Sequence, residues 1–260
     1  MSTQRIGFIG TGVMGSGMIR NLQKAGYPVN INTRTKAKAE KLIQEGCRWF
    51  DSQAELAAQS DVVITMVGYP QDVEAVYFGE HGVFRGKQGG FVIDMTTSSP
   101  SLAKRIYTQA KKQGIEALDA PVSGGDIGAR QGTLAIMAGG EEAAFEAMKP
   151  IFSAMGQTLT YFGPAGSGQY AKMSNQIAIA SNMMGVCEAM AYAKKAASTR
   201  KKSSPPFPPE PPAPGPWRIW HRACCKAIRN QVFTSSTSSK TCASLSNRQK
   251  KWDWTCQDCA

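Results

Sequence analysis

The chain has 260 residues, enough for one large domain or two ordinary domains that each bury a core. Its formal net charge of +11 would suggest a polyanionic partner, but residues 1–197 hold 19 Lys and Arg against 16 Asp and Glu, whereas residues 198–260 hold 11 against 3. The basic character therefore belongs mostly to the last quarter of the chain, and we expect no nucleic-acid partner.

The cysteines divide in the same way. Cys47 and Cys187 are too far apart in sequence to suggest a disulfide framework, and the other five of the seven cysteines follow residue 223. The N-terminus has no basic, apolar and small-residue signal pattern, and no apolar run approaches membrane-spanning length. We therefore expect a cytoplasmic protein with no membrane partner.

Residues 5–161 alternate between short runs rich in β-branched residues and amphipathic helical stretches, which is typical of parallel strands joined by crossover helices. Some runs, such as Val62–Val67, are apolar throughout, as expected where helices cover both faces of a sheet. The fold class is therefore α/β, with a doubly wound parallel sheet within residues 1–165. The predicted strands are Arg5–Gly10, Pro28–Thr33, Asp61–Met66, Gly90–Asp94, Glu116–Asp119, Leu134–Ala138 and Thr158–Tyr161.

The pattern changes after Gly168. Residues 169–195 contain neither Gly nor Pro except Gly185, and Ala, Met and Ile recur at helical spacing, so we predict one long, largely buried helix within residues 166–196. Its methionines fit core positions better than a binding surface. Residues 197–260 include a segment, 205–216, with eight of the fourteen prolines, and show no periodicity, which predicts a disordered tail without a packed core.

A glycine pattern follows the first predicted strand and opens a helix. The run Gly10-Thr11-Gly12-Val13-Met14-Gly15 matches the G-x-G-x-x-G fingerprint of a Rossmann dinucleotide-binding domain. The first glycine permits the tight turn, the second lets the backbone approach the pyrophosphate, and the third lets helix and strand pack closely. The phosphates would lie at the helix N-terminus, whose free N–H groups and dipole favour an anion.

The end of the second strand predicts the cofactor. An NAD enzyme would carry Asp or Glu there to bind the ribose hydroxyls, but this chain has Thr33, Arg34 and Thr35. No carboxylate is present to repel a 2′-phosphate, and Arg34 could pair with it, so NADP is favoured over NAD. The alternative is that Arg34 is merely solvated.

Three ordered motifs carry a family resemblance. Gly7-Phe-Ile-Gly-Thr-Gly-Val-Met-Gly15, Asp119-Ala-Pro-Val-Ser-Gly-Gly125 and Gly166-Ser-Gly-Gln-Tyr-Ala-Lys-Met-Ser-Asn175 resemble the signatures of the β-hydroxyacid dehydrogenases. That family includes 3-hydroxyisobutyrate dehydrogenase, tartronate semialdehyde reductase and the glyoxylate and succinic semialdehyde reductases. The resemblance covers about residues 4–196 and implies hydride transfer between NAD(P) and a short hydroxy acid or semialdehyde.

The third motif supplies the candidate catalytic residues. Lys172 lies in the first turns of an apolar helix, where burial would lower the pKa of its amine and make it a usable general acid/base. Asn175 follows three residues later, on the same helix face, and could orient the substrate or the lysine. The family often has a second Asn next, where this chain has Gln176. A surface lysine is the alternative interpretation.

The other motifs indicate where the ligands bind. Ser123, Gly124 and Gly125 form a glycine-rich turn whose hydroxyl and bare amides could bind a substrate carboxylate. The resemblance also places Met66-Val67 and Thr96-Thr97 around the nicotinamide, and both pairs fall at strand carboxyl ends, where doubly wound sheets bind ligands.

Other functional classes fit less well. His81 and His221 have no Asp or Ser partner near a strand end, and Cys256-x-x-Cys259 is at most half a zinc site, so we expect no metal. An imine reductase of the same architecture is disfavoured because such enzymes commonly lack a lysine where Lys172 stands. A catalytically dead NAD(P)-binding module stays open as an alternative, which turnover would exclude.

The tail suggests a hypothesis about its own origin. Back-translated and shifted by one base, it can encode stretches such as Gly-Leu-Asp-Pro-Glu-Lys-Val-Leu that resemble the family's all-α C-terminal domain. The hypothesis is a single-base deletion near Ala196–Ala197 that truncates this domain. The family is homo-oligomeric through contacts in that domain, so oligomerisation is doubtful for this chain. We expect the cofactor domain to fold, cofactor binding to weaken and catalysis to be largely lost.

Overall fold

The computed structural model describes residues 4–198. The chain divides into two compact units, Met1–Ser174 and Asn175–Ala260, so the described part covers most of the first unit and the first 24 residues of the second. The predicted disordered tail lies outside the described residues except for its first two positions, and so does the Cys256-x-x-Cys259 pair.

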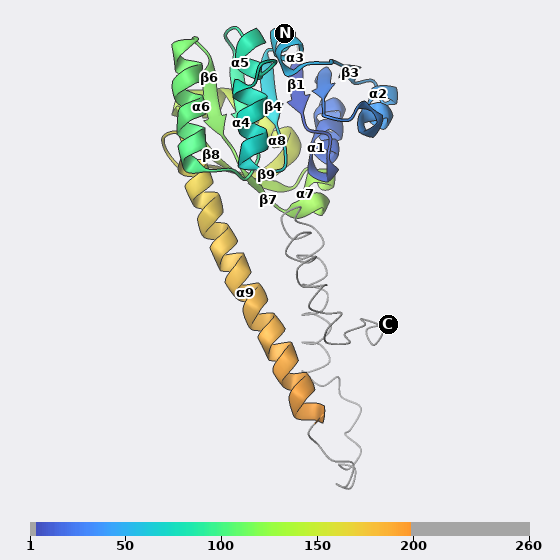
Figure 1. The fold of residues 1–260 in the computed structure, drawn as a ribbon, viewed down its shortest axis with the longest axis vertical. Helices are drawn as coiled ribbons and strands as arrows, with labels where there is room; N and C mark the ends of the chain where they lie inside the picture. Colours follow the sequence, from blue (N-terminus) through green and yellow to red (C-terminus); the bar gives the residue numbers. More distant parts are fainter. Residues whose placement is uncertain (1–3, 199–260) are drawn as a thin grey trace. The chain divides into compact units, whose positions relative to one another are not determined.

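The first unit is built on a nine-stranded sheet with the order β3-β2-β1-β4-β5-β6-β8-β7, and β9 pairs with β8 (Figure 1). The order reverses between β1 and β4, which makes a switch point of the kind where doubly wound sheets bind ligands. The strands are β1 (Ile6–Ile9), β2 (Val29–Asn32), β3 (Arg48–Trp49), β4 (Val62–Thr65), β5 (Phe91–Asp94), β6 (Glu116–Asp119), β7 (Val122–Ser123), β8 (Leu134–Gly140) and β9 (Gly156–Tyr161).

All seven predicted strands are confirmed, and so is the doubly wound, mostly parallel sheet, which has antiparallel pairing at one edge. The strands β1 to β6 pair in parallel, whereas β8 runs antiparallel to both β6 and β7. The two-residue strands β3 and β7 were not predicted. The reversal arises because β8 follows the short helix after β7 and returns along the sheet, and periodicity in sequence carries no information about strand direction.

Helices cover both faces of this sheet, as the apolar strands predict (Figure 1). One core cluster joins α1, α2 and α8 to residues such as Phe8 and Ile64, and the other joins α3 to α6 to residues such as Ile9 and Val63. The helices are α1 (Val13–Lys24), the 3₁₀ helix η1 (Lys36–Ala39), α2 (Glu40–Gln44), α3 (Gln53–Ala58), α4 (Pro70–Phe78), α5 (Val83–Gly86), α6 (Pro100–Lys112), α7 (Gly125–Gln131), α8 (Glu142–Met155) and α9 (Ser167–Ser198).

The long helix is confirmed as α9, but the prediction that it is largely buried is wrong for the described residues. Met173 and Met184 are 44% and 64% exposed, and Met183 and Met190 are half-buried. Apolar residues are spread around α9 rather than gathered on one face, so full burial would require packing partners on every side. Residues 4–198 do not supply those partners.

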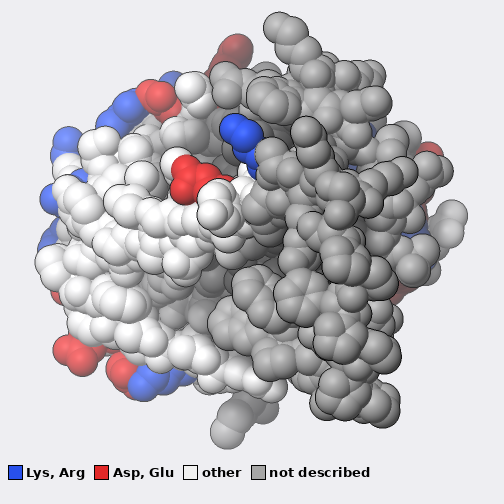
Figure 2. All heavy atoms as spheres, turned by 90° about the horizontal axis from the view of Figure 1, so that it is seen from below, with Lys and Arg blue, Asp and Glu red and all other residues white. Residues whose placement is uncertain are grey.

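In the view of Figure 2, charged side chains of both signs lie mainly at the rim of the described part, and most of that surface is uncharged. None of the helices within residues 4–198 has the length and apolar character needed to cross a membrane.

Candidate active site

The glycine fingerprint forms the turn between β1 and α1. Gly10 has a φ of +105°, and a Cβ at this residue would lie 2.1 Å from the carbonyl oxygen of Met66. A Cβ on Gly15 would lie 2.0 Å from the carbonyl oxygen of Gly10. These two glycines are therefore required by the fold itself, through the turn and the close approach of α1 to the strand ends.

Gly12 differs from its two neighbours in the fingerprint. A Cβ there would meet no atom within 4 Å, so packing does not explain the glycine. The helix α1 begins directly after it without a side-chain cap, which leaves its N–H groups open to an anion. Thr11 is 6% exposed, and its Oγ1 atom has no hydrogen-bond partner among the described residues. The loop thus fits a dinucleotide pyrophosphate.

The residues after β2 lie at the surface. Arg34 has an 85% exposed side chain, and its Nη1 atom lies 3.3 Å from Oδ1 of Asp72 in the first turn of α4. Thr33 is half-buried and Thr35 is exposed. Arg34 is therefore neither buried nor simply solvated. Exposed ion pairs of this kind contribute little stability, so the guanidinium can exchange the carboxylate for a phosphate.

The two segments predicted to surround the nicotinamide contact each other. The backbone N–H of Val67 donates to Oγ1 of Thr96 at 3.0 Å. Met66 lies beside Gly10, as the close approach of its carbonyl oxygen shows. The structure thus brings the fingerprint and both predicted nicotinamide segments together at the carboxyl ends of β1, β4 and β5.

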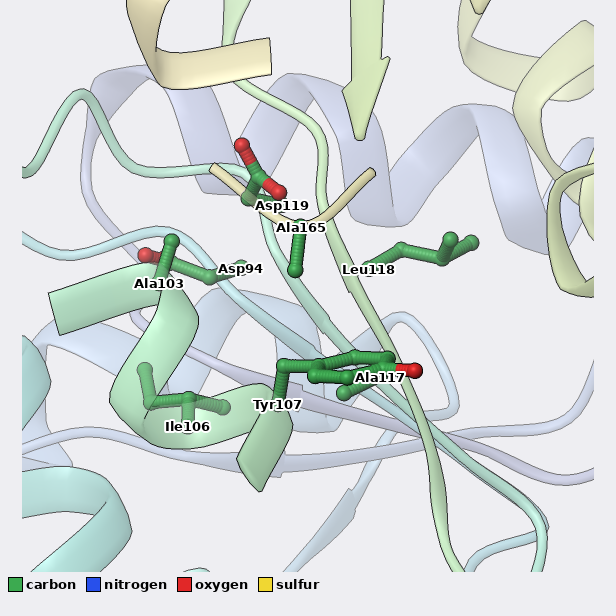
Figure 3. A pocket seen from close by; sticks show the side chains of 8 residues that line it. All are labelled: Asp94, Ala103, Ile106, Tyr107, Ala117, Leu118, Asp119 and Ala165. Carbon is green, nitrogen blue, oxygen red and sulfur yellow. The ribbon is translucent and has the colours of Figure 1, made fainter. Parts of the chain in front are cut away.

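Two buried carboxylates end the next pair of strands. Asp94 ends β5, Asp119 ends β6, and the two are direct partners across the parallel strands. Both line a small cavity of about 10 Å³, room for about one water molecule (Figure 3). Burial raises the pKa of Asp94 to about 6 and also raises the pKa of Asp119, although donated hydrogen bonds oppose the shift in both.

Asp119 holds the start of α9. Its carboxylate accepts hydrogen bonds from the N–H groups of Gly166 at 2.7 Å and Gln169 at 2.9 Å. A side chain from β6 therefore satisfies free donors at the N-terminus of α9, as a helix-capping residue would. This fixes the first turns of α9 against the carboxyl end of the sheet.

Lys172 lies in those first turns and is 6% exposed. Burial lowers the pKa of its amine to about 8. The predicted burial and the predicted direction of the pKa shift are therefore confirmed. An amine with this pKa exchanges protons readily near neutral pH, as an acid/base group must.

The glycine-rich turn has the predicted local structure. The strand β7 ends at Ser123, Gly124 adopts a φ of +126°, and α7 begins at Gly125. Asn21 of α1 binds the helix that follows the turn, since its Nδ2 atom donates to the carbonyl oxygen of Ala129 in α7 at 2.7 Å. The helices α1 and α7 are thus packed together.

Asn175 is the first residue of the second compact unit and is half-buried. Its role beside Lys172 stays a prediction. Within residues 4–198, no group of three or more His, Cys, Asp and Glu side chains could hold a metal ion.

Asp94, Asp119 and Gln169 were not among the site residues predicted from the sequence. Asp119 opens the second family motif, and Asp94 is a carboxylate that ends an apolar strand, so both gave a signal. Gln169 lies within the third family motif, but its burial could not be predicted, because a glutamine in a helix is ordinarily an exposed residue.

Strand order and glycine loop together place residues 4–174 in the class of nicotinamide dinucleotide-binding domains of oxidoreductases. The family described as the NAD binding domain of 6-phosphogluconate dehydrogenase matches residues 5–163. An uncharacterized oxidoreductase of Bacillus subtilis is 61% identical over 191 residues, which are 73% of this chain and 66% of that protein. The probable mitochondrial 3-hydroxyisobutyrate dehydrogenase-like protein 1 of Arabidopsis thaliana is 49% identical over 203 residues, 77% of this chain and 60% of that protein.

Among solved structures, the Mycobacterium tuberculosis 3-hydroxyisobutyrate dehydrogenase with L-serine matches with a TM-score of 0.70 and 33% identity, over 76% of this chain and 67% of that one. The chain belongs to the β-hydroxyacid dehydrogenase family, as the three motifs predicted. It spans slightly less than two thirds of the length of the Bacillus and Arabidopsis relatives.

Proposed function

We propose that the chain transfers a hydride between NADP(H) and a short hydroxy acid or its semialdehyde form, with Lys172 as the general acid/base. The observation that carries this proposal is the buried amine of Lys172, with its pKa lowered to about 8, on a helix capped by the carboxyl end of β6. Membership of a dehydrogenase family favours an enzyme over a non-catalytic binding module.

The proposed mechanism assigns proton transfer to Lys172. When bound, the nicotinamide supplies or accepts the hydride. In reduction, the Lys172 ammonium donates a proton to the substrate carbonyl oxygen. In oxidation, the neutral amine removes the hydroxyl proton. Met66-Val67 and Thr96-Thr97 would line the nicotinamide side, and Asn175 would orient the substrate or the lysine.

The proposed substrate is a small carboxylate bound at Ser123, Gly124 and Gly125. The Ser123 hydroxyl and the backbone N–H groups at the start of α7 can donate to its oxygens. Asp126 follows directly, but Arg130 neutralises it through an ion pair of 2.9 Å. The Mycobacterium tuberculosis relative was solved with L-serine, which is a hydroxylated carboxylate.

The proposed cofactor preference is NADP over NAD. The exposed guanidinium of Arg34 can reach a 2′-phosphate, and its present partner, Asp72, holds it by only one contact of 3.3 Å. No carboxylate side chain stands at residues 33–35, where the ribose hydroxyls of NAD would require one.

We also propose a cytoplasmic location and a shifted reading frame for the tail. Cys47 and Cys187 are free thiols, as expected in a reducing compartment. The proposed domains are a dinucleotide-binding domain at residues 1–165, the start of the all-α domain at 166–196 and an aberrant segment at 197–260. A coding sequence whose shifted frame does not read as a helical domain would exclude the frameshift.

The test is oxidation of NADPH and NADH by the purified chain with glyoxylate, succinic semialdehyde and methylmalonate semialdehyde. A second version with the shifted frame restored and a Lys172→Ala variant of each are assayed beside it. We expect NADPH-dependent turnover in the restored version, weaker or lost turnover in the present chain, and a loss of about 10²-fold to 10⁴-fold in kcat without Lys172.

Equal turnover in both versions would show that residues 1–197 suffice and would contradict the proposed loss of function in the tail. If both versions bind the cofactor and neither turns over any of the three substrates, the proposed function is wrong and the chain is a binding module.

A further inference from the structure

The side chain of Gln169 is fully buried one turn before Lys172. We infer that Gln169 is a positioning residue for Lys172, because its amide ties the start of α9 to the Thr96–Ser98 segment beside the proposed nicotinamide site. The inference rests on the proposed function for its kinetic consequences but not for its structural ones.

Both polar atoms of the Gln169 amide are used. Its Nε2 atom donates to the carbonyl oxygen of Thr96 at 2.8 Å, and its Oε1 atom accepts from the N–H of Ser98 at 2.9 Å. The two bonds pair with an N–H and a carbonyl oxygen of one backbone segment, as a neighbouring strand would. A buried group with both partners in place holds a single orientation, since losing either bond would leave an unsatisfied polar atom.

The segment that Gln169 holds is itself fixed. The N–H of Thr96 donates to Oδ1 of Asp94 at 3.0 Å, and its Oγ1 accepts from the N–H of Val67 at 3.0 Å. The Ser98 hydroxyl donates to Oδ2 of Asp94, also at 3.0 Å. Gln169 therefore connects α9 to a rigid frame that contains both predicted nicotinamide segments.

Because of the helical spacing, the hydrogen bonds that fix Gln169 also restrict the position of Lys172. Residues three apart in a helix share a face, so Lys172 leaves α9 on the same side as Gln169. The bonds from Asp119 to Gly166 and Gln169 fix the position of α9 along its axis. The bonds of the Gln169 amide fix the rotation of α9 about that axis. The low exposure of Lys172 therefore depends on the position of the helix.

Only a side chain with one donor and one acceptor at this length can make both bonds. Methionine has a similar length and shape but makes neither bond. Ionised glutamate accepts from Ser98 but cannot donate to Thr96, whereas protonated glutamate can do both. The variants Gln169→Met and Gln169→Glu thus separate volume from hydrogen bonding, and Met173→Leu is a matched control at an exposed position of the same helix.

The first readout does not need turnover. In full-length chain labelled with ¹³C-lysine, the Cε signal of Lys172 is identified by its loss in Lys172→Arg and followed against pH. We expect the Gln169→Met and Gln169→Glu substitutions to move its titration midpoint upward by about one unit, as hydration of the amine increases and, in Glu, a negative charge is added. Met173→Leu should leave the midpoint in place. Unchanged midpoints in both folded Gln169 variants would overturn the inference.

The second readout is kinetic. In the version that turns over, we expect Gln169→Met to lower kcat by about 10-fold to 100-fold while the KM for NADPH stays within about 3-fold, because misplacement of a catalytic group affects the reaction more than binding. The kcat of Gln169→Glu relative to wild type should recover as the pH falls and the glutamate becomes protonated. A Gln169→Glu to wild-type ratio that does not change with pH would indicate a merely structural role and overturn the inference.

The two readouts also separate this inference from the proposed function. If neither the present chain nor the version with the restored frame shows turnover, the proposed function fails, and the Lys172 titration still decides whether Gln169 positions the lysine.

Discussion

Two buried polar clusters lie at opposite ends of the central sheet. The amino-end cluster consists of Asn30, Ser60 and Lys87, and the carboxyl-end cluster consists of Asp94, Asp119 and Gln169. In the amino-end cluster, the Asn30 amide donates to Ser60 Oγ at 3.0 Å, and the Lys87 amine donates to the carbonyl oxygen of Ser60 at 2.6 Å. In the carboxyl-end cluster, the side chains bind the Thr96–Ser98 segment and the start of α9.

The two clusters are similarly buried and use similar hydrogen bonds, but they bind different segments. The hydrogen bonds of the amino-end cluster join β2, the α3–β4 connection and Lys87, which directly follows α5, and none of these is a predicted site residue. Those of the carboxyl-end cluster join the segments that carry Thr96 and Lys172. Burial and hydrogen bonding alone therefore do not distinguish a residue that stabilises the fold from one that positions the site. The two kinds of residue differ in which segments their hydrogen bonds join.

The strongest test of this distinction uses two glycines of one loop. Gly15→Ala should lower the free energy of unfolding by about 3 kcal/mol, because its Cβ would lie 2.0 Å from a backbone oxygen. Gly12→Ala should leave stability nearly unchanged, because its Cβ would meet no atom within 4 Å, but should weaken NADPH binding. Urea unfolding and NADPH fluorescence titration measure the two effects. A Gly12→Ala variant that binds NADPH like wild type would contradict the pyrophosphate site.

The amino-end cluster should affect stability alone. Asn30→Ala removes two donated hydrogen bonds, of 3.1 Å to the carbonyl oxygen of Gln59 and 3.0 Å to Ser60 Oγ, and should cost about 2 kcal/mol. Its NADPH affinity and the Lys172 titration midpoint should match wild type at temperatures where both are folded. A shifted Lys172 midpoint would show that the two ends of the sheet are coupled and would break the comparison.

A smaller effect is expected at the surface beside β2. Arg34→Ala should weaken NADPH binding by about 10-fold relative to NADH, a difference of about 1.4 kcal/mol, because it removes the proposed phosphate partner. Lys41→Ala, at an exposed lysine of α2, is a control for loss of one positive charge. Equal losses for NADPH and NADH in Arg34→Ala would refute the proposed cofactor preference.

Sequence predicted the sheet well because its strands are short, apolar and bounded by helical stretches. The missed strands β3 and β7 have two residues each, too few for any periodicity. The antiparallel direction of β8 and the exposure of Met173 and Met184 could not be predicted, since both depend on what packs against a segment rather than on the segment itself.

The site was predicted in part for a similar reason. Gly10, Gly15 and Lys172 were predicted because each is unusual where it stands. The two glycines form a turn directly after a strand, and the lysine lies in an apolar helix. Gln169 was not found, because its function depends on two backbone groups more than 70 residues earlier in the chain. Long-range partners of this kind leave no local pattern.

The central claim is that Lys172 transfers the proton, and the most direct measurement is the pH dependence of kcat/KM in both directions for the version that turns over. Burial lowers the pKa of this amine from 10.5 to about 8. Reduction uses the ammonium, so its kcat/KM should be level below about pH 8 and fall tenfold per unit above it. Oxidation uses the neutral amine, so its kcat/KM should rise tenfold per unit up to about pH 8 and then level off. Profiles that bend in the same direction for both reactions, or a bend that persists in Lys172→Ala, would contradict the account.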